Sequence, residues 1–386
     1  MTWNQQIVKM NNKRDILDLI RQHSPISRAD ISVRLGLTKA TVSSLVNELS
    51  DSFLCYESGP GESSGGRRPV MLLFNKDAGY SIGIDIGVNY ILGILTNLNG
   101  NIIVEKHEPY QIDNYETTLR KVKELINYLI DSTPISPYGV IGIGIGVPGI
   151  VNNEGSILLA PNLDWQNINI KNELEQEYNV PIIIENEANA GAYGEKKYGA
   201  GKDYENIIYI SAGIGIGAGL ILNNLLYRGG HGFSGELGHM IIEHEGKLCR
   251  CGSKGCWEVY ASEQALLKVA GDRLKQENRI TLEALLTKVN ENKDIQEIFR
   301  EIGIYLGIGI SNICNTFNPE QIIIGNRLAV AKEWIQPAIH EVLQKRTLKH
   351  HLHTLQLNFS DLTIYSTALG SAAHAIDLFI TTTINE

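Results

Sequence analysis

The feature that most constrains the fold of this chain is a glycine-rich, apolar strand pattern that occurs twice. Residues 80–110 read as a strand, a glycine turn, a strand, an Asn-Gly turn and a third strand, and a related pattern begins near residue 207. An amphipathic helix, with apolar residues at positions 119, 122, 125, 126 and 129, and a buried strand follow the first copy. Two such α/β units predict two lobes with a cleft between them, the usual position of a small-ligand site.

The segment before the first repeat differs in charge from the rest. Residues 1–74 contain nine Lys and Arg against seven Asp and Glu, whereas the remaining residues contain 25 against 36. The overall net charge of −9 argues against a chain that coats nucleic acid along its whole length. It is compatible with one basic module joined to an acidic one.

Three short helices are predicted in this segment, the first of them from an apolar stripe at residues 16–20. "SRADISVRLG" begins with Ser27 and Asp30 at capping-box spacing and ends at Gly36. "LTKATVSSLVNELS" has Thr38 as its predicted N-cap, followed by one apolar face and one small, polar face. Two such helices with a tight turn predict a helix-turn-helix whose second helix enters the major groove of DNA.

The polar face of the second helix and a following wing supply the predicted DNA contacts. Alternating segments on both sides of "GPGESSGGRR" predict two strands with a loop, and its arginines are suited to phosphates or a narrow minor groove. Asn47 is the candidate for reading an adenine edge. A small helical cap with an ordinary surface loop is the alternative. The predicted DNA-binding residues are Lys39, Thr41, Ser43, Ser44, Asn47, Arg67 and Arg68.

Three of the five cysteines lie within "CRCGSKGCWE". Cys249, Cys251 and Cys256, together with a histidine just upstream, provide the donors of a closed, structural Cys₃His zinc site. Spacing alone leaves His239 and His244 open as the fourth ligand. The alternatives are free thiols or a strained disulfide between Cys249 and Cys251. Cys55 and Cys314 stand alone in apolar surroundings and are predicted to be core residues.

The chain is expected to be cytoplasmic. It shows no signal peptide, and its longest apolar run, residues 140–151, is too short and too rich in glycine to span a bilayer. In a reducing compartment, clustered cysteines favour a metal over disulfides.

Five motifs carry a resemblance to a known family. "GIDIG", "GIGVPGIV", "APNLDW", "ENEANAGAYGE" and "GELGHMIIEHEGKLCRCGSKGCWE" are similar to those of the ROK family of repressors and sugar kinases. The resemblance covers nearly all of the chain after residue 77 and implies an actin-like fold of two lobes. It predicts a winged helix-turn-helix at 1–77 and a sugar-sensing domain at 78–386. The lobes are expected at roughly 78–190 and 191–386, with the zinc loop at 239–256.

The same resemblance assigns the ligand-binding residues. It selects His239 as the fourth zinc ligand, with its second ring nitrogen facing the sugar. Carboxylates and amides suit sugar hydroxyls because they accept and donate several hydrogen bonds at once. The implied sugar-binding residues are Asn162, Asn186, Glu187, Glu236, His239 and Glu258.

The sequence departs from the kinases of the family at the nucleotide motifs. Those kinases read Asp-x-Gly-Gly-Thr-Lys after the first strand, whereas residues 85–90 here are Asp-Ile-Gly-Val-Asn-Tyr. Ser211-Ala212-Gly213 replaces Gly-Thr-Gly, Gly325-Asn326 replaces a double glycine, and Glu187 replaces the catalytic Asp. These changes predict a sensor that is not an enzyme, with an ATP-dependent sugar kinase as the alternative.

The resemblance is strongest to the repressor branch of the family, and within it to the repressors that respond to D-xylose. It implies a homodimer that binds a palindromic double-stranded operator and is released by the sugar. Any such release requires that DNA and sugar favour different states of the protein.

Overall fold

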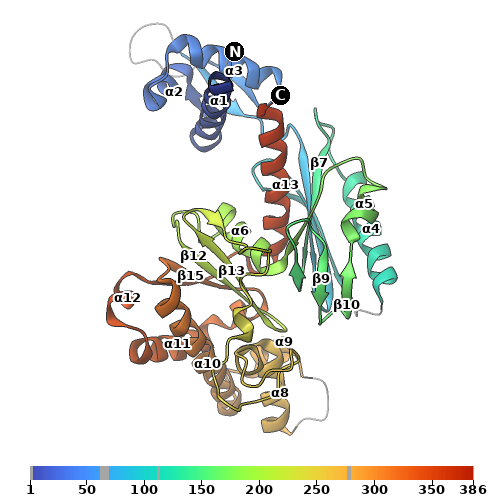
Figure 1. Cartoon of the computed structure of the whole chain (residues 1–386), viewed down its shortest axis with the longest axis vertical. Helices are drawn as coiled ribbons and strands as arrows, with labels where there is room; N and C mark the ends of the chain where they lie inside the picture. Colours follow the sequence, from blue (N-terminus) through green and yellow to red (C-terminus); the bar gives the residue numbers. More distant parts are fainter. Residues whose placement is uncertain (1–2, 61–68, 111–113, 276–279, 386) are drawn as a thin grey trace.

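The computed structural model describes residues 3–60, 69–110, 114–275 and 280–385. Three parts follow one another along the long axis of the molecule: a small N-terminal module and two larger lobes (Figure 1). Among these residues, no helix is long and apolar enough to cross a membrane.

The N-terminal module is a three-helix unit with a small antiparallel sheet of order β1-β3-β2. Its second helix begins at the Ser27 cap and ends at Gly36, which has a left-handed φ of 66°, and its third helix begins at the Thr38 cap, as predicted. Cys55 is buried in the core of this module. The elements are α1 (Trp3–His23), β1 (Ile26–Ser27), α2 (Arg28–Leu35), α3 (Lys39–Asp51), β2 (Cys55–Pro60) and β3 (Val70–Phe74).

The first lobe is built on a five-stranded sheet of order β11-β7-β4-β5-β6. The first three repeat strands pair as an antiparallel meander, and β7 and β11 add parallel strands beside β4. A smaller sheet, β10-β9-β8, lies beside it. The elements are β4 (Tyr80–Ile86), β5 (Tyr90–Asn97), β6 (Ile102–Pro109), α4 (Tyr115–Asp131), β7 (Val140–Val147), β8 (Ile150–Val151), β9 (Ile157–Ala160), β10 (Trp165–Ile168), α5 (Ile170–Glu175) and β11 (Ile182–Asn186).

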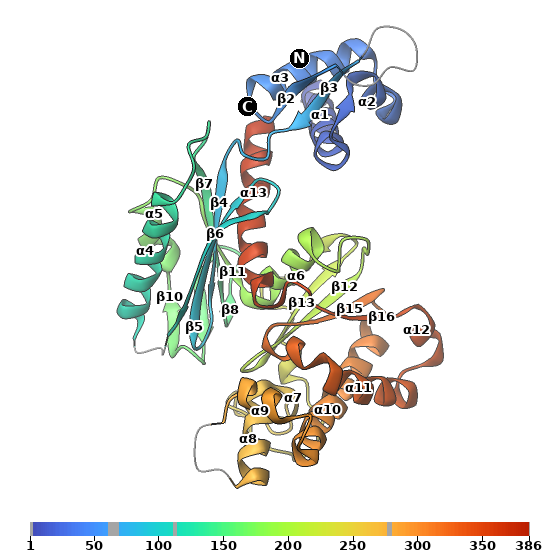
Figure 2. The ribbon, with the colours of Figure 1, turned by 180° about the vertical axis from the view of Figure 1, so that it is seen from behind.

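The second lobe repeats this plan with a sheet of order β14-β13-β12-β15-β16, covered by helices at the other end of the molecule (Figure 2). Cys314 is buried in α10. The elements are α6 (Glu187–Tyr198), β12 (Ile207–Ala212), β13 (Ile216–Leu222), β14 (Leu225–Leu226), η1 (Leu237–His239), α7 (Glu258–Ala261), α8 (Glu263–Leu274), α9 (Leu282–Lys288), α10 (Lys293–Phe317), β15 (Gln321–Gly325), η2 (Arg327–Ala331), α11 (Lys332–Arg346), α12 (Lys349–Thr354), β16 (Gln356–Phe359) and η3 (Thr363–Tyr365).

The C-terminal helix α13 (Ser366–Asn385) joins all three parts of the molecule. It crosses from the second lobe to pack against β4, β7 and α6, and its far end reaches the N-terminal module (Figure 2). Ile376, Ile380 and Ile384 share one buried cluster with Ile16 and Ile20 of α1. The core of the N-terminal module is therefore completed by the far end of the chain.

The position of α13 differs from the prediction that the two lobes are separate segments divided near residue 190. Although α13 lies in the range predicted for the second lobe, it lies against the first sheet, and Gly83 and Gly144 allow its backbone to approach that sheet closely. Residue limits cannot describe these lobes as two uninterrupted segments.

Candidate functional site

A cavity of about 950 Å³ lies between the two lobes. Its lining includes all six residues predicted to bind sugar, from both lobes: Asn162, Asn186, Glu187, Glu236, His239 and Glu258. Segments separated by almost a hundred residues in the sequence therefore face one cavity. The site is large enough for a monosaccharide and is lined by carboxylates and amides.

The predicted metal ligands lie together at the edge of this cavity. The donor atoms of His239, Cys249, Cys251 and Cys256 are all within 4.8 Å of one another, whereas His244 is an exposed residue outside this group. Cys251 Sγ is 3.6 Å from Cys256 Sγ, and Cys249 Sγ is 3.7 Å from His239 Nδ1. Zinc bond lengths of roughly 2.0–2.3 Å give tetrahedral edges of about 3.5–3.8 Å, so these two pairs match a zinc site, and three thiols with one imidazole are a donor set that zinc prefers.

The loop is folded by its own backbone. Leu248 and Lys254 form a bridge, Ile241 and Cys256 form another, and Cys249 N donates to Ser253 O at 2.8 Å. Gly255 has a φ of 80°, and a side chain there would overlap the carbonyl of Glu243. The tight turn therefore needs glycine to bring Cys256 back to the other thiols.

The histidine presents its two ring nitrogens to different groups. Nδ1 faces Cys249, and Nε2 lies 3.9 Å from a carboxylate oxygen of Glu236. On the other side, Glu258 Oε1 is 3.0 Å from Cys249 Sγ. The candidate metal ligands are thus flanked by two of the predicted sugar ligands, Glu236 and Glu258.

Glu187 is the most strongly perturbed carboxylate of the predicted sugar set. Burial raises its pKa to about 7, a hydrogen bond from Ser211 acts in the opposite direction, and the charge of Glu236 raises it further. Ser211 Oγ lies 3.5 Å from Glu187 Oε1. A half-buried carboxylate of this kind would gain from ligand hydroxyls that replace its lost hydration.

Asn186 has a structural role that the sequence analysis did not assign. It is the N-cap of α6: its Oδ1 accepts from the backbone N–H groups of Ala188 and Asn189, and its Nδ2 donates to Gly149 O at 2.8 Å. Only one N–H of the amide is left for a ligand. The signal was present in the sequence, because Asn followed by Glu after an apolar strand is typical of a helix start.

Asn162 is engaged by a residue from the other side of the cleft. Arg250, between two of the zinc-loop cysteines, donates from Nη1 to Asn162 Oδ1 at 2.8 Å. Both residues line the cavity. Arg250 was not predicted as a site residue, because nothing in its local sequence identifies a partner 88 positions away.

The other end of the cavity is lined by residues 87–90, by the segment that starts at Gly213, and by Asn326. Tyr90 lies over Gly87, so that even a methyl group at Gly87 would overlap its ring, and Tyr90 donates to Asp85 Oδ2 at 2.6 Å. Asn326 Nδ2 donates to Ser211 Oγ at 3.0 Å and is 3.0 Å from the position of a Cβ at Gly213. A side chain of the protein thus lies directly against Gly87 and another against Gly213.

In the N-terminal module, the predicted DNA contacts lie on α3, opposite its buried residues. Lys39, Ser44 and Asn47 are exposed, and Thr41 and Ser43 are half-buried. Asn47 Oδ1 also accepts a hydrogen bond from Arg28 at 3.3 Å, a contact that spacing did not predict. Arg67 and Arg68 lie outside the described residues.

Comparisons with known proteins match the N-terminal module and the two lobes to two different families. The sequence matches the ROK family over residues 81–377 and the winged helix-turn-helix DNA-binding family over residues 11–52. It is 45% identical over 379 residues to the xylose repressor of Bacillus subtilis (strain 168), with 98% of each chain covered.

Two solved structures are similar over long ranges. The first is a ROK family transcriptional regulator, a homologue of the Escherichia coli MLC protein, which is 28% identical with a TM-score of 0.82. The match covers 99% of this chain and 100% of the regulator. A ROK family glucokinase from Streptomyces griseus, in complex with glucose and AMPPNP, covers 78% of this chain and 100% of its own at 27% identity and a TM-score of 0.72. The chain belongs to the ROK family and carries the winged helix-turn-helix module in front of the ROK domain.

Proposed function

We propose that this protein is a cytoplasmic, homodimeric repressor of xylose-utilisation genes, and that D-xylose in the cleft releases it from a palindromic operator. The observation that carries the proposal is the cavity between the lobes, where six polar residues from separate segments converge. The similarity to xylose repressors over almost the full chain supports the identity of the sugar.

The helix α13 supports a coupling between sugar and DNA. At its start, Thr367 donates to the carbonyl of Glu187 at 3.1 Å, so it lies directly behind the cavity. At its other end, Ile384 belongs to the buried core of the DNA-binding module, and its carbonyl accepts from Lys13 at 3.4 Å. A shift of the lobes around a bound sugar would therefore be transmitted to the winged module by one rigid helix.

Zinc has a structural role in this proposal. His239, Cys249, Cys251 and Cys256 would hold it, and with four protein ligands it would stabilise the loop without acting as a Lewis acid. The bound zinc would hold Glu236, His239 and Glu258 in position at one side of the sugar.

The occupied phosphate loops support a sensor that is not a kinase. Tyr90 and Asn326 fill space that phosphates would need, and Arg327 Nε and Nη2 pair with both carboxylate oxygens of Glu263 at 2.7 and 2.9 Å. The cleft is thus suited to a sugar without a nucleotide.

A mobility-shift titration tests the proposal. The protein is bound to DNA from upstream of a xylose-utilisation operon and titrated with D-xylose or matched D-glucose, without ATP. Release by xylose at millimolar concentration, but not by glucose, is the expected result. Retention at every xylose concentration would refute xylose as the effector, and ATP consumption dependent on the sugar would favour the kinase.

A further inference from the structure

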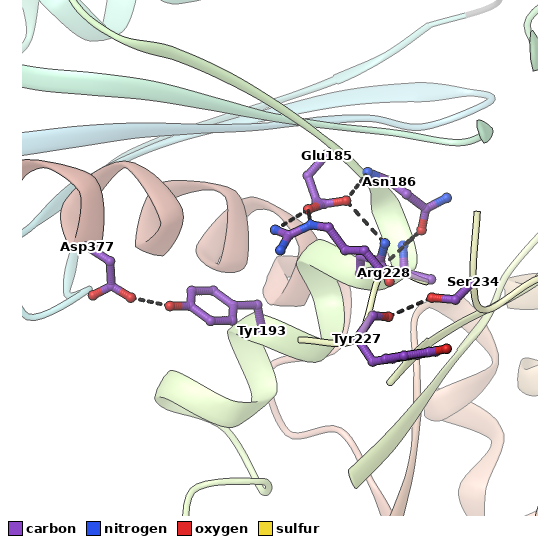
Figure 3. Close-up of polar contacts among 9 residues, drawn as sticks. Glu185, Asn186, Tyr193, Tyr227, Arg228, Ser234 and Asp377 are labelled. Atoms are coloured by element: carbon purple, nitrogen blue, oxygen red, sulfur yellow. Dashed lines mark hydrogen bonds and ion pairs between the residues drawn. The ribbon is translucent and has the colours of Figure 1, made fainter. Parts of the chain in front are cut away.

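A half-buried ion pair joins the two lobes beside the predicted sugar residues. Arg228, in the segment after β14, donates from Nε to Glu185 Oε2 at 2.8 Å, and its Nη2 is 2.6 Å from the same oxygen (Figure 3). Glu185 belongs to β11 of the first lobe, and its side chain is only 8% exposed. A carboxylate buried to this extent depends on its cationic partner.

The remaining oxygen of Glu185 organises the start of α6. Oε1 accepts from the backbone N–H of Asn186 at 2.9 Å and from Asn189 Nδ2 at 3.2 Å. The next two residues of the chain, Asn186 and Glu187, both face the cavity. The carboxylate paired with Arg228 therefore also holds the backbone that presents half of the predicted sugar set.

Arg228 is tied equally closely to the other half of that set. Its carbonyl accepts from Ser234 N at 3.2 Å, and the Ser234 hydroxyl donates to the carbonyl of Tyr227 at 2.6 Å, which closes the segment 227–234 (Figure 3). Gly235 then packs against the carbonyl of Ala218, and its own carbonyl accepts from Ala218 N at 3.1 Å. Glu236 follows directly, and His239 lies one turn further on.

We infer that Arg228 is a positioning residue of the sugar site. By pairing with Glu185 it keeps the loop of Glu236 and His239 in register with the Asn186–Glu187 junction across the two lobes. The inference rests on the proposed sugar binding and adds a residue that acts through Glu185, without a contact of its own to the sugar. Groups that bind a small ligand must be held within roughly 0.5 Å of their productive positions, which a flexible junction between lobes would not ensure.

The test measures D-xylose binding by titration calorimetry and operator binding by mobility shift, on the full chain. Arg228→Gln, Glu185→Gln and the double variant are compared with Arg273→Gln. Arg273 is a matched control because it is also 38% exposed and pairs with a glutamate, Glu301, at a place away from the cavity. Removing residues that orient a binding group commonly costs roughly 10- to 100-fold in affinity, and we expect a loss of that order for Arg228→Gln.

The two readouts separate positioning from folding. We expect Arg228→Gln to bind operator without sugar as the wild type does, to need a higher xylose concentration for release, and to show the same loss as the double variant. Losses that add in the double variant would overturn action through Glu185, as would xylose affinity equal to that of Arg273→Gln. If Arg228→Gln does not fold, Glu185→Gln, which removes the other charge of the same pair, replaces it, and wild-type affinity there would overturn the inference. Arg228→Lys, which keeps the charge, should retain most of the affinity.

Failure of the proposed function gives a different pattern. If the wild type itself binds no xylose, the proposed effector is refuted and this inference with it. If the wild type binds xylose and all the variants bind it equally well, the proposed function stands and only the role of Arg228 is wrong.

Discussion

The two ends of the cleft differ in whether their polar groups face the cavity or bond to other residues of the protein. At the proposed sugar end, carboxylates and amides face a cavity, and Glu187 is half-buried with a raised pKa. At the phosphate end, Tyr90 and Asn326 fill the loops, and their polar atoms bond to Asp85 and Ser211. Ser211 touches both ends, because it also contacts Glu187. In the proposed function, the first end therefore binds the sugar, whereas the polar groups of the second end are used within the protein.

The zinc loop is the part of the sugar end whose loss should have the largest effect. Cys256 is fully buried, so Cys256→Ser would remove a metal ligand and leave a polar group in its place. We expect loss of bound zinc and about 4 kcal/mol or more of destabilisation, the range typical of a lost structural metal. Zinc content by atomic absorption and chemical unfolding measure the two effects.

Cys314→Ser is the control for this substitution. Cys314 is also buried, in α10, but it lies outside the metal cluster. Its replacement should cost about 1–3 kcal/mol, the cost of burying a hydroxyl, and should leave zinc bound. Equal destabilisation by the two variants, with zinc retained in both, would remove the basis for the metal site.

The two ends of the cleft can be compared directly with one substitution in each. Glu187→Ala should weaken xylose binding by about 1.5–3 kcal/mol, roughly 10- to 150-fold, because hydrogen bonds to a charged group are lost. Asn326→Ala acts on the sugar end only through Ser211 and should change the affinity by no more than about fivefold. Calorimetry on both variants gives the answer, and similar losses would mean that the two ends are not functionally separate.

Much of this arrangement could be predicted because its signals are local. The helix caps at Ser27 and Thr38, the strand repeat and the close spacing of the three cysteines all lie within short segments. Periodicity and cap chemistry depend on neighbouring residues, so the sequence carries them directly.

The contacts that join the lobes could not be predicted in this way. Arg228 pairs with a residue 43 positions away, and α13 completes the core of a module at the opposite end of the chain. A charged or apolar residue shows which kind of partner it needs but does not identify that partner. The family resemblance selected His239, yet it gave no role to Arg250, because a motif assigns residues without their contacts.

The buried carboxyl of Asp85 predicts that the free energy of unfolding depends on pH. Burial, followed by the charge of Glu187, raises the pKa of Asp85 to about 8, against the hydrogen bond from Tyr90. A carboxyl with a raised pKa binds its proton more tightly in the folded state, so folding stability falls as the pH rises toward 8. At up to about 1.4 kcal/mol per pH unit, the wild type should lose roughly 2 kcal/mol between pH 6 and 8 through this group.

Asp85→Asn removes that dependence. Unfolding curves at pH 6, 7 and 8 should therefore diverge between the wild type and Asp85→Asn, with the variant gaining relative stability as the pH rises. Asp361→Asn, at an exposed position, serves as the control and should run parallel to the wild type. Parallel curves for Asp85→Asn would mean that Asp85 is charged in the folded protein.

The smallest expected effect concerns the hydrogen bond over the mouth of the cleft. Arg250 is exposed and Asn162 is half-buried at the surface of the cleft, so their contact across the lobes should be worth less than about 1 kcal/mol. Because it bridges the zinc loop and the turn between β9 and β10, its loss should favour opening of the cleft, and Arg250→Gln should release xylose up to about fivefold faster. Stopped-flow displacement of the sugar measures this rate. Lys254→Gln removes a cation of the same loop that pairs with Glu245 within the lobe, and it should leave the rate unchanged. An equal acceleration in both variants would show that the positive charge of the loop sets the release rate. The Arg250–Asn162 hydrogen bond would then have no role in holding the cleft closed.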